Sequence, residues 1–286
     1  MRKIFAVLVI SLLLPLCLRA AAPALTEAVV WAQALETVAR SLSELTTQHE
    51  AELARGLAYH KFFHGNPRHK LLALTFDDGP HPRFTPRLLA LLREQHVKAT
   101  FFVVGEMAAR HPELIKAEIA DGHNVGNHTY HHVNLTKIPT AQVGTEIVAC
   151  GKTLEAITGK APHLFRPPGG DYNRGVAEAA EAAGYTTVLW SDDPGDYASP
   201  GNAVIESRME AQASNGGVIL IHDGIEQTLQ VLPYFIATMR ARGYTFVTVD
   251  ALIADAHRPC PKKAGSPLVH HGVLSNLQPG KDPTHR

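Results

Sequence analysis

The 286-residue sequence predicts an α/β fold in which parallel strands alternate with helices and form a barrel. Short apolar runs alternate with segments of helical periodicity over most of the chain, as in folds built from βα units. No glycine-rich phosphate loop follows the first run, which disfavours a dinucleotide-binding sheet. Charged or titratable side chains follow five of the runs, which is typical of the carboxyl-terminal face of a βα barrel.

The N-terminus is typical of an export signal. Arg2 and Lys3 precede an apolar run over residues 4–18, and small residues follow at 20–22. A membrane span needs roughly 20 apolar residues, so this run is short for one. We therefore expect residues 1–22 to be a signal peptide, the mature protein to be periplasmic or extracellular, and no membrane span to remain after cleavage.

Two cysteines, Cys150 and Cys260, remain after such a cleavage. An oxidising compartment permits a disulfide between them. Nothing in the sequence brings them together, so pairing stays open.

Residues 23–66 are predicted to be an amphipathic helical N-terminal segment, in which one long helix, or two, ends near Gly56. The apolar residues at helical spacing in this segment include Trp31, Leu42, Leu45 and Leu53. An apolar stripe must be buried, either against the following domain or against another chain, and packing on the domain is the favoured interpretation.

The strands and helices of the main domain, residues 67–257, follow from the alternation of the sequence. The expected strands are residues 71–76, 99–104, 124–127, 163–165, 186–190, 218–221 and 246–249. The expected helices are residues 85–95, 112–121, 140–158, 174–183, 202–213 and 226–242. Residues 258–286 are rich in Pro, Gly, His and Lys, which predicts a mobile tail.

Asp77 and Asp78 follow the first apolar run and precede Gly79-Pro80. Asp-Asp-Gly is favourable turn chemistry, so a turn without function is one interpretation. The other is a cation site, because adjacent carboxylates at a buried strand end raise each other's pKa. A bound cation would hold one carboxylate ionised and leave the other free to act as a base.

His128 and His132 have the spacing of metal ligands. Imidazoles four residues apart face the same way on a helical turn, and a carboxylate completes a three-ligand site that stays open to water. His131 offers a competing spacing of three residues, and the spacing alone does not choose between them.

Three more polar residues follow predicted strands: Arg166, Asp193 and His222. Each has a structural alternative, namely a surface ion pair, an Asp-Pro-Gly-Asp turn and a core histidine, respectively. Together with the aspartates and His128 they form a pattern that turn chemistry does not produce, and this joint pattern favours a functional site.

These motifs resemble the polysaccharide deacetylases with a NodB-homology domain, carbohydrate esterase family 4. The resemblance lies in 75–79 (Thr-Phe-Asp-Asp-Gly), 128–132 (His-Thr-x-x-His) and 166–170 (Arg-Pro-Pro-Gly-Gly), followed by 193–197 (Asp-x-x-Asp-Tyr) and 220–223 (Leu-Ile-His-Asp). All five stand in the family's order. The resemblance covers about residues 71–249 and leaves out the N-terminal segment and the tail.

The resemblance implies a distorted (β/α)7 barrel and a divalent metal on Asp78, His128 and His132 rather than His131. The metal is usually zinc, with cobalt or nickel as alternatives. A metal-activated water is the nucleophile that amide hydrolysis needs at neutral pH.

The resemblance also implies the roles of the remaining residues. Asp77 is the expected general base with Arg166 as its charge partner. His222 is the expected general acid, and Asp193 the carboxylate that orients it.

Three residues are expected to contact substrate. The Gly169 amide is the expected oxyanion donor, Tyr197 a wall of the groove, and Leu220 the lining of the acetyl pocket. The family usually has an aromatic residue in place of Gly169 and Trp in place of Tyr197, which leaves the substrate range open.

The expected substrate is an acetylated polysaccharide: peptidoglycan, a chitin-like polymer or poly-glucosamine. Lys and Arg number 27 and so do Asp and Glu, so the net charge does not favour nucleic acid as a partner. The alternatives are an O-acetyl polysaccharide esterase using the same site and a non-catalytic carbohydrate-binding relative. A phosphohydrolase is disfavoured, since its two aspartates are separated by one residue and Asp77 and Asp78 are adjacent. The oligomeric state stays open.

Overall fold

The structure is a computed structural model that describes residues 39–258. The predicted signal peptide, the first part of the predicted helical segment, Cys260 and the predicted tail from residue 259 on lie outside the described residues. Within residues 39–258, no helix is both long enough and apolar enough to cross a lipid bilayer.

An eight-stranded parallel sheet forms the centre of the molecule, as the alternating sequence predicts. Its spatial order is β1-β6-β5-β4-β3-β2-β7, and β8 also pairs with β2. The strands are β1 (Lys61–Phe62), β2 (Leu71–Gly79), β3 (Thr100–Val103), β4 (Asn124–Asn127), β5 (Leu164–Phe165), β6 (Thr186–Val188), β7 (Gly217–His222) and β8 (Thr245–Phe246).

The strands curve into a barrel that no continuous ladder closes within residues 39–258. Beyond β6, Asp192 forms a single parallel bridge with Ile219 of β7. Beyond β1, the Gly65 N–H donates to the carbonyl of Gly216 at 2.7 Å. The β1–β6 end of the sheet therefore approaches β7, the opposite end, only through isolated hydrogen bonds, which makes the barrel a distorted one.

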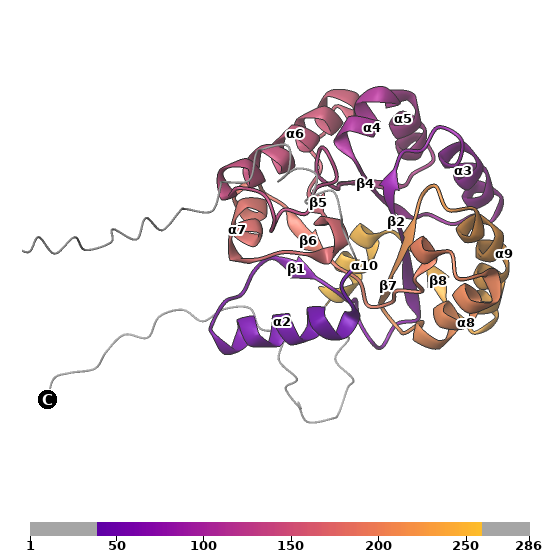
Figure 1. Ribbon diagram of the computed structural model, residues 1–286. Helices are drawn as coiled ribbons and strands as arrows, with labels where there is room; N and C mark the ends of the chain where they lie inside the picture. The colour runs from indigo at the N-terminus through magenta and orange to yellow at the C-terminus, as the bar shows by residue number, and fades with distance from the viewer. Residues whose placement is uncertain (1–38, 259–286) are drawn as a thin grey trace, which may run out of the picture.

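Helices surround the strands (Figure 1). They are α2 (Leu42–Ala54), α3 (Thr85–Glu94), α4 (Gly105–Arg110), α5 (Pro112–Ala120), α6 (Thr140–Thr158), α7 (Arg174–Ala182), α8 (Asn202–Gln212), α9 (Glu226–Ala241) and α10 (Val249–Ala256). Helix α10 begins where the sequence predicted the end of a last strand, because Thr248 caps it by accepting the Ala251 N–H at 3.3 Å.

Strand β2 separates two cores, because successive side chains of a strand point to opposite faces. Leu72, Leu74 and Phe76 pack in the core formed with the outer helices. Ala73 packs in the second core, which includes barrel-interior residues. The interior is thus lined at β2 by small and polar side chains, which leaves room for the functional groups described below.

The N-terminal segment differs from its prediction. Helix α2 ends near Gly56 as expected, but of the apolar residues in it only Leu45 is buried, while Leu42 and Leu53 are 41% and 43% exposed. Residues of β1, which follow the expected end of the helix and for which no strand was predicted, pair with β6. The sheet therefore begins before residue 67, because the chain after α2 supplies an edge strand.

Candidate metal and catalytic centre

A β-bulge at the end of β2 places two neighbouring carboxylates toward one point. The pairing of β2 with β3 shifts register between Phe76 and Gly79, and Asp78 has a left-handed backbone with φ of 71°. Adjacent strand residues normally face opposite sides, and a bulge redirects one of them. Asp77 Oδ2 and Asp78 Oδ1 consequently lie 3.6 Å and 3.5 Å from the same atom, His128 Nε2.

Asp78, His128 and His132 form the cluster that the sequence predicted as a metal site. Their ligand atoms all lie within 4.8 Å of one another. His132 Nε2 is 3.0 Å from Asp78 Oδ1, and the two imidazole centroids are 5.0 Å apart. Burial raises the pKa of Asp78, but hydrogen bonds with His128 and His132 and the charges of His132 and His222 hold it well below the usual range.

The two histidines are not on a helical turn, so that part of the prediction is wrong. Residues 128–136 form an irregular loop in which Thr129 and His132 have φ of 65° and 55°. The left-handed backbone at these residues brings the His128 and His132 rings together. In a helix, the regular spacing of side chains along one face would do this instead. His131 faces away, with its Nδ1 2.8 Å from Glu146 Oε1 of α6.

The donor set fits a divalent metal ion. One carboxylate and two imidazoles are the protein ligands of a known type of catalytic zinc site, which keeps a further position for water. His128 Nδ1 lies 2.8 Å from the Arg166 carbonyl oxygen. A proton on Nδ1 leaves the Nε2 lone pair free to coordinate, which is the second contact expected of a metal-bound histidine.

Arg166 holds Asp77 inside the barrel. Its Nη1 donates to Asp77 Oδ1 at 2.7 Å and to the Thr75 hydroxyl at 2.8 Å. The guanidinium is fully buried and lies 4.1 Å from the centroid of the Phe102 ring. A buried cation paired in this way balances the charge of the Asp77 carboxylate and holds it in one orientation.

His222 lies opposite Asp77 in the pairing of β2 with β7. The carboxylate that orients it is Asp196 and not Asp193, which corrects the sequence prediction. Asp196 Oδ1 is 2.7 Å from His222 Nδ1, and Oδ2 accepts the His222 backbone N–H at 2.8 Å. The Thr228 hydroxyl donates to the same carboxylate at 2.6 Å.

Asp193 closes the turn that brings Asp196 into place. Its Oδ1 accepts the Gly195 N–H at 2.8 Å, and Gly195 has φ of 69°. The turn of 193–196 then returns the chain to the end of β7. Both aspartates of this turn are present in the sequence motif. The Pro194-Gly195 pair between them favours a tight turn, and this turn could have indicated that Asp196 approaches the end of β7.

The pKa of His222 reflects opposing effects. Burial lowers it, while the hydrogen bond and charge of Asp196, with smaller contributions from Asp78 and Asp77, raise it to about 9. The imidazole is therefore protonated at neutral pH in this geometry, as a general acid requires.

Of the three residues expected to contact substrate, Tyr197 lies beside His222, Leu220 lies on β7 and Gly169 follows β5. Tyr197 is 43% exposed and its ring centroid lies 5.5 Å from that of His222. Leu220 is buried in the second core, two residues before His222 on the same strand face. Gly169 follows β5 in a short turn, with φ of 63°.

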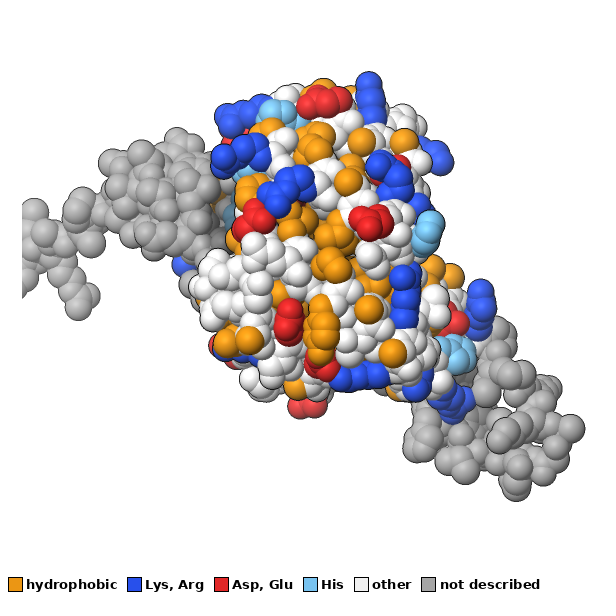
Figure 2. Space-filling view, turned by 90° about the vertical axis from the view of Figure 1, so that its right-hand side faces the viewer, with side chains coloured by type: hydrophobic (Ala, Val, Ile, Leu, Met, Phe, Trp, Pro, Cys, Tyr) orange, Lys and Arg blue, Asp and Glu red, His pale blue; other side chains and the backbone are white. Residues whose placement is uncertain are grey.

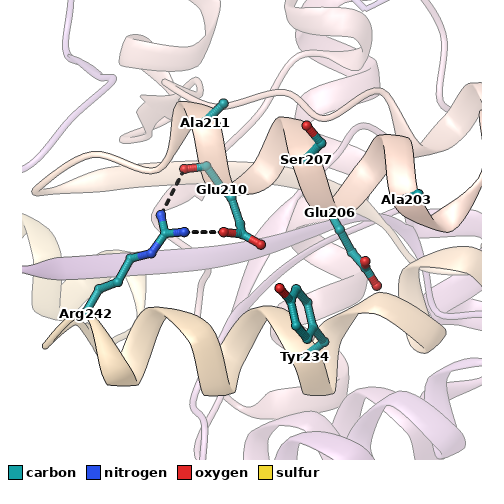
Figure 3. Close-up of a pocket in the computed structure, with 7 residues that line it drawn as sticks. All are labelled: Ala203, Glu206, Ser207, Glu210, Ala211, Tyr234 and Arg242. Atoms are coloured by element: carbon teal, nitrogen blue, oxygen red, sulfur yellow. Dashed lines mark hydrogen bonds and ion pairs between the residues drawn. The ribbon is translucent and has the colours of Figure 1, made fainter.

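Two surface hollows lie away from this centre. One lies between α8 and α9, where Glu210 contacts Arg242 beside Tyr234 (Figure 3). The face that carries α3, α8 and α9 mixes acidic, basic and apolar side chains, and no charge dominates it (Figure 2). The site is defined here by its convergent side chains.

Fold and site together define a parallel α/β barrel with a carboxylate–imidazole cluster at the carboxyl ends of its strands. Residues 64–188 match the family model described as polysaccharide deacetylase. The chain is 40% identical over 193 residues to a peptidoglycan-N-acetylglucosamine deacetylase of Bacillus cereus, an alignment covering 66% of this chain and 90% of that protein. The chain belongs to the polysaccharide deacetylase family, carbohydrate esterase family 4, as its motifs indicated.

Solved structures agree with this assignment. A crystal structure of a peptidoglycan N-acetylglucosamine deacetylase matches with a TM-score of 0.67 and 31% identity, covering 71% of this chain and 95% of that one. A pseudoenzyme of the same family from Bacillus anthracis matches with a TM-score of 0.66 and 25% identity, covering 70% of this chain and 71% of that one. Because that relative is a pseudoenzyme, the shared fold alone does not imply activity.

Proposed function

We propose that this protein hydrolyses the N-acetyl groups of an N-acetylglucosamine-containing polysaccharide, leaving free amines and acetate. The observation that carries the proposal is the convergence of two functional sets in one barrel mouth. Asp78, His128 and His132 would supply the metal ligands. Asp77 and His222 lie side by side on the paired strands β2 and β7.

Zinc is the proposed metal. When bound, it would supply a water activated near neutral pH and a Lewis acid for the acetyl carbonyl. The three ligands leave a further coordination position open to solvent and substrate.

Asp77 is the proposed general base. Its carboxylate lies at the edge of the ligand cluster and is 3% exposed, so a proton taken from the attacking water stays in the site. The hydrogen bond from Arg166 orients this carboxylate toward the site, and the positive charge of Arg166 balances its negative charge.

His222 is the proposed general acid. Asp196 holds its Nδ1, so Nε2 is the atom that donates a proton to the departing sugar amine. The Gly169 amide is the proposed donor to the developing oxyanion, Leu220 the lining for the acetyl methyl, and Tyr197 a wall for the sugar.

Substitution Asp77→Asn tests this proposal. We expect acetate release from N-acetylglucosamine oligomers by the zinc-loaded full chain to fall about 10²–10⁴-fold, because the base is lost while the ligands remain. Asp250→Asn is the matched control, since Asp250 pairs with His163 at the start of β5. Equal, near-blank rates for the parent and Asp77→Asn would instead indicate a carbohydrate-binding pseudoenzyme.

The same groups can hydrolyse an O-acetyl ester, whose leaving group needs less help from an acid. Acetate release from a panel of N- and O-acetylated glycans, with and without chelator, separates the two activities.

We also propose export through residues 1–22, a deacetylase domain over 67–257 extended by β1, and a tail from 258.

A further inference from the structure

Helix α2 contacts the loop that follows β5 at two points. The Arg40 backbone N–H, just before the helix, donates to the Gly169 carbonyl at 2.9 Å. Eight residues later, Gln48 Nε2 donates to the Tyr172 carbonyl at 3.1 Å. The loop after Arg166 is thus held along its length by the N-terminal segment, which the family motifs do not include.

A buried polar cluster joins the same elements. Tyr172 is 3% exposed, and its hydroxyl lies 2.7 Å from Lys61 Nζ of β1 and 3.3 Å from Glu52 Oε2 of α2. Lys61 also forms an ion pair with Glu52 and lies 4.8 Å from the Tyr172 ring centroid. Separating a buried ion pair leaves an uncompensated charge, so this cluster strongly resists displacement of α2.

The peptide between Gly169 and Gly170 is held at both of its polar atoms. The Gly169 carbonyl of this peptide accepts the Arg40 N–H, and the Gly170 N–H donates to the Pro167 carbonyl at 2.9 Å. Both glycines have positive φ, 63° and 67°. A Cβ on Gly170 would lie 2.5 Å from the Trp190 ring, so the loop has little freedom on its inner side.

On its other side the loop holds the segment that follows His132. Asp171 Oδ2 accepts hydrogen bonds from Asn134 Nδ2 at 2.8 Å and from the Thr136 hydroxyl at 3.0 Å. Asn134 Oδ1 in turn accepts the Thr136 N–H at 3.0 Å. A continuous set of contacts therefore leads from α2 through the loop to the neighbourhood of a proposed metal ligand.

We propose that α2 is a positioning element of the reaction site: by holding loop 167–172, it sets the orientation of the Gly169 peptide and of the segment after His132. The inference rests on the proposed function. Neither Arg40 nor Gln48 touches substrate in this proposal; both act through the loop. Misplacement of a reacting group by about 1 Å lowers rates about 10²-fold, so a loosened loop affects the rate.

The decisive comparison is Arg40→Pro against Arg40→Ala in the zinc-loaded full chain. Both variants lose the Arg40 side chain, which contacts Gln48 and the Glu44 carbonyl. Only proline also removes the N–H that holds Gly169. We expect kcat on N-acetylglucosamine oligomers to be about tenfold lower in Arg40→Pro than in Arg40→Ala, with KM within about twofold.

Hydrogen exchange supplies a readout independent of activity. We expect faster exchange of the Gly170 and Thr136 amides in Arg40→Pro than in Arg40→Ala, and unchanged exchange of the Leu220 amide in β7. Equal exchange and equal kcat in the two variants would overturn the inference. Inactivity of the parent protein would refute the proposed function, while the exchange comparison would still decide whether α2 positions the loop.

A second pair guards against misfolding of Arg40→Pro. Gln48→Leu removes the donor to the Tyr172 carbonyl, and Thr47→Leu is its exposed neighbour on the same helix. We expect only Gln48→Leu to lower kcat and accelerate exchange at residues 169–172. Identical behaviour of these two variants would show that α2 packs on the domain without positioning the loop.

Discussion

Asp78, Thr129 and His132 have left-handed backbones, with φ of 71°, 65° and 55°. Such conformations cost an L-residue about 1–3 kcal/mol each and persist only where the surroundings enforce them. Two of these residues are proposed metal ligands and the third lies between His128 and His132. Local strain therefore coincides with the position where the chain brings its donors together.

The pairing of His222 with Asp196 leads to a pH-dependent prediction. Asp196→Asn removes the charge and hydrogen-bond geometry that raise the pKa of His222 to about 9. The acid then deprotonates at lower pH, so we expect the alkaline limb of the kcat/KM profile to shift downward. Asp193→Asn, which disrupts a turn, is expected to shift the limb less. Equal shifts in the two variants would argue against the Asp196 assignment.

Glu118 is a buried carboxyl that the proposed reaction does not use. Neither of its oxygens has a hydrogen-bond partner among the described residues, and burial, together with the charge of Asp223, raises its pKa well above the usual range. The folded state therefore binds this proton more tightly than the unfolded state, and stability falls as pH rises above the unfolded pKa of about 4.3.

We expect Glu118→Gln to remove this pH-dependent loss. The variant should match the parent near pH 4 and exceed it at pH 8 by about 1–3 kcal/mol in the free energy of unfolding. Urea denaturation at the two pH values measures the difference. Glu113→Gln on the same helix, where the side chain is 66% exposed, should leave the pH dependence unchanged.

At the scale of elements, strand β4 depends on a close approach to β3. A Cβ on Gly126 would lie 2.7 Å from the Phe102 ring, and that ring lies against the Arg166 guanidinium. Overpacking here displaces the side chain that holds Asp77. The spacing of two strands thus controls the position of a proposed catalytic pair.

We expect Gly126→Ala to lower the free energy of unfolding by about 1–3 kcal/mol and to reduce kcat. Gly144→Ala in α6 is the matched control, because its Cβ meets no atom within 4 Å. Alanine there should raise stability by about 0.5–1 kcal/mol through helix propensity. Thermal unfolding of both variants checks the prediction, and a stabilised Gly126→Ala would contradict it.

At the scale of the whole molecule, metal binding is expected to stabilise the fold, because the ligands come from β2 and from the loop after β4. Zinc at 100 times its Kd adds about 2.7 kcal/mol, or about 5–10 °C in Tm for a domain of this size. Chelator should reverse the shift. His132→Ala should abolish it and His131→Ala should retain it, since His131 contacts Glu146.

The barrel as a whole was predictable because the repeated alternation of apolar runs and amphipathic segments specifies parallel βα units. Strands β2, β3, β4 and β7 lie where the apolar runs predicted them. Strand β1 was missed because two residues carry no periodicity and gain their place only by pairing with β6. The end of the last predicted strand was wrong because Thr248 caps a helix there.

The sequence alone determined the fold class, the family and the types of residue that gather at the strand ends. It did so because the order and spacing of residues fix which side chains follow each strand. Tertiary structure decided the rest: the bulge that aligns Asp77 with Asp78, the left-handed loop that pairs His128 with His132, and the choice of Asp196 over Asp193. The physical reason is that orientation depends on backbone torsions and on partners distant in the chain. No local pattern contains either.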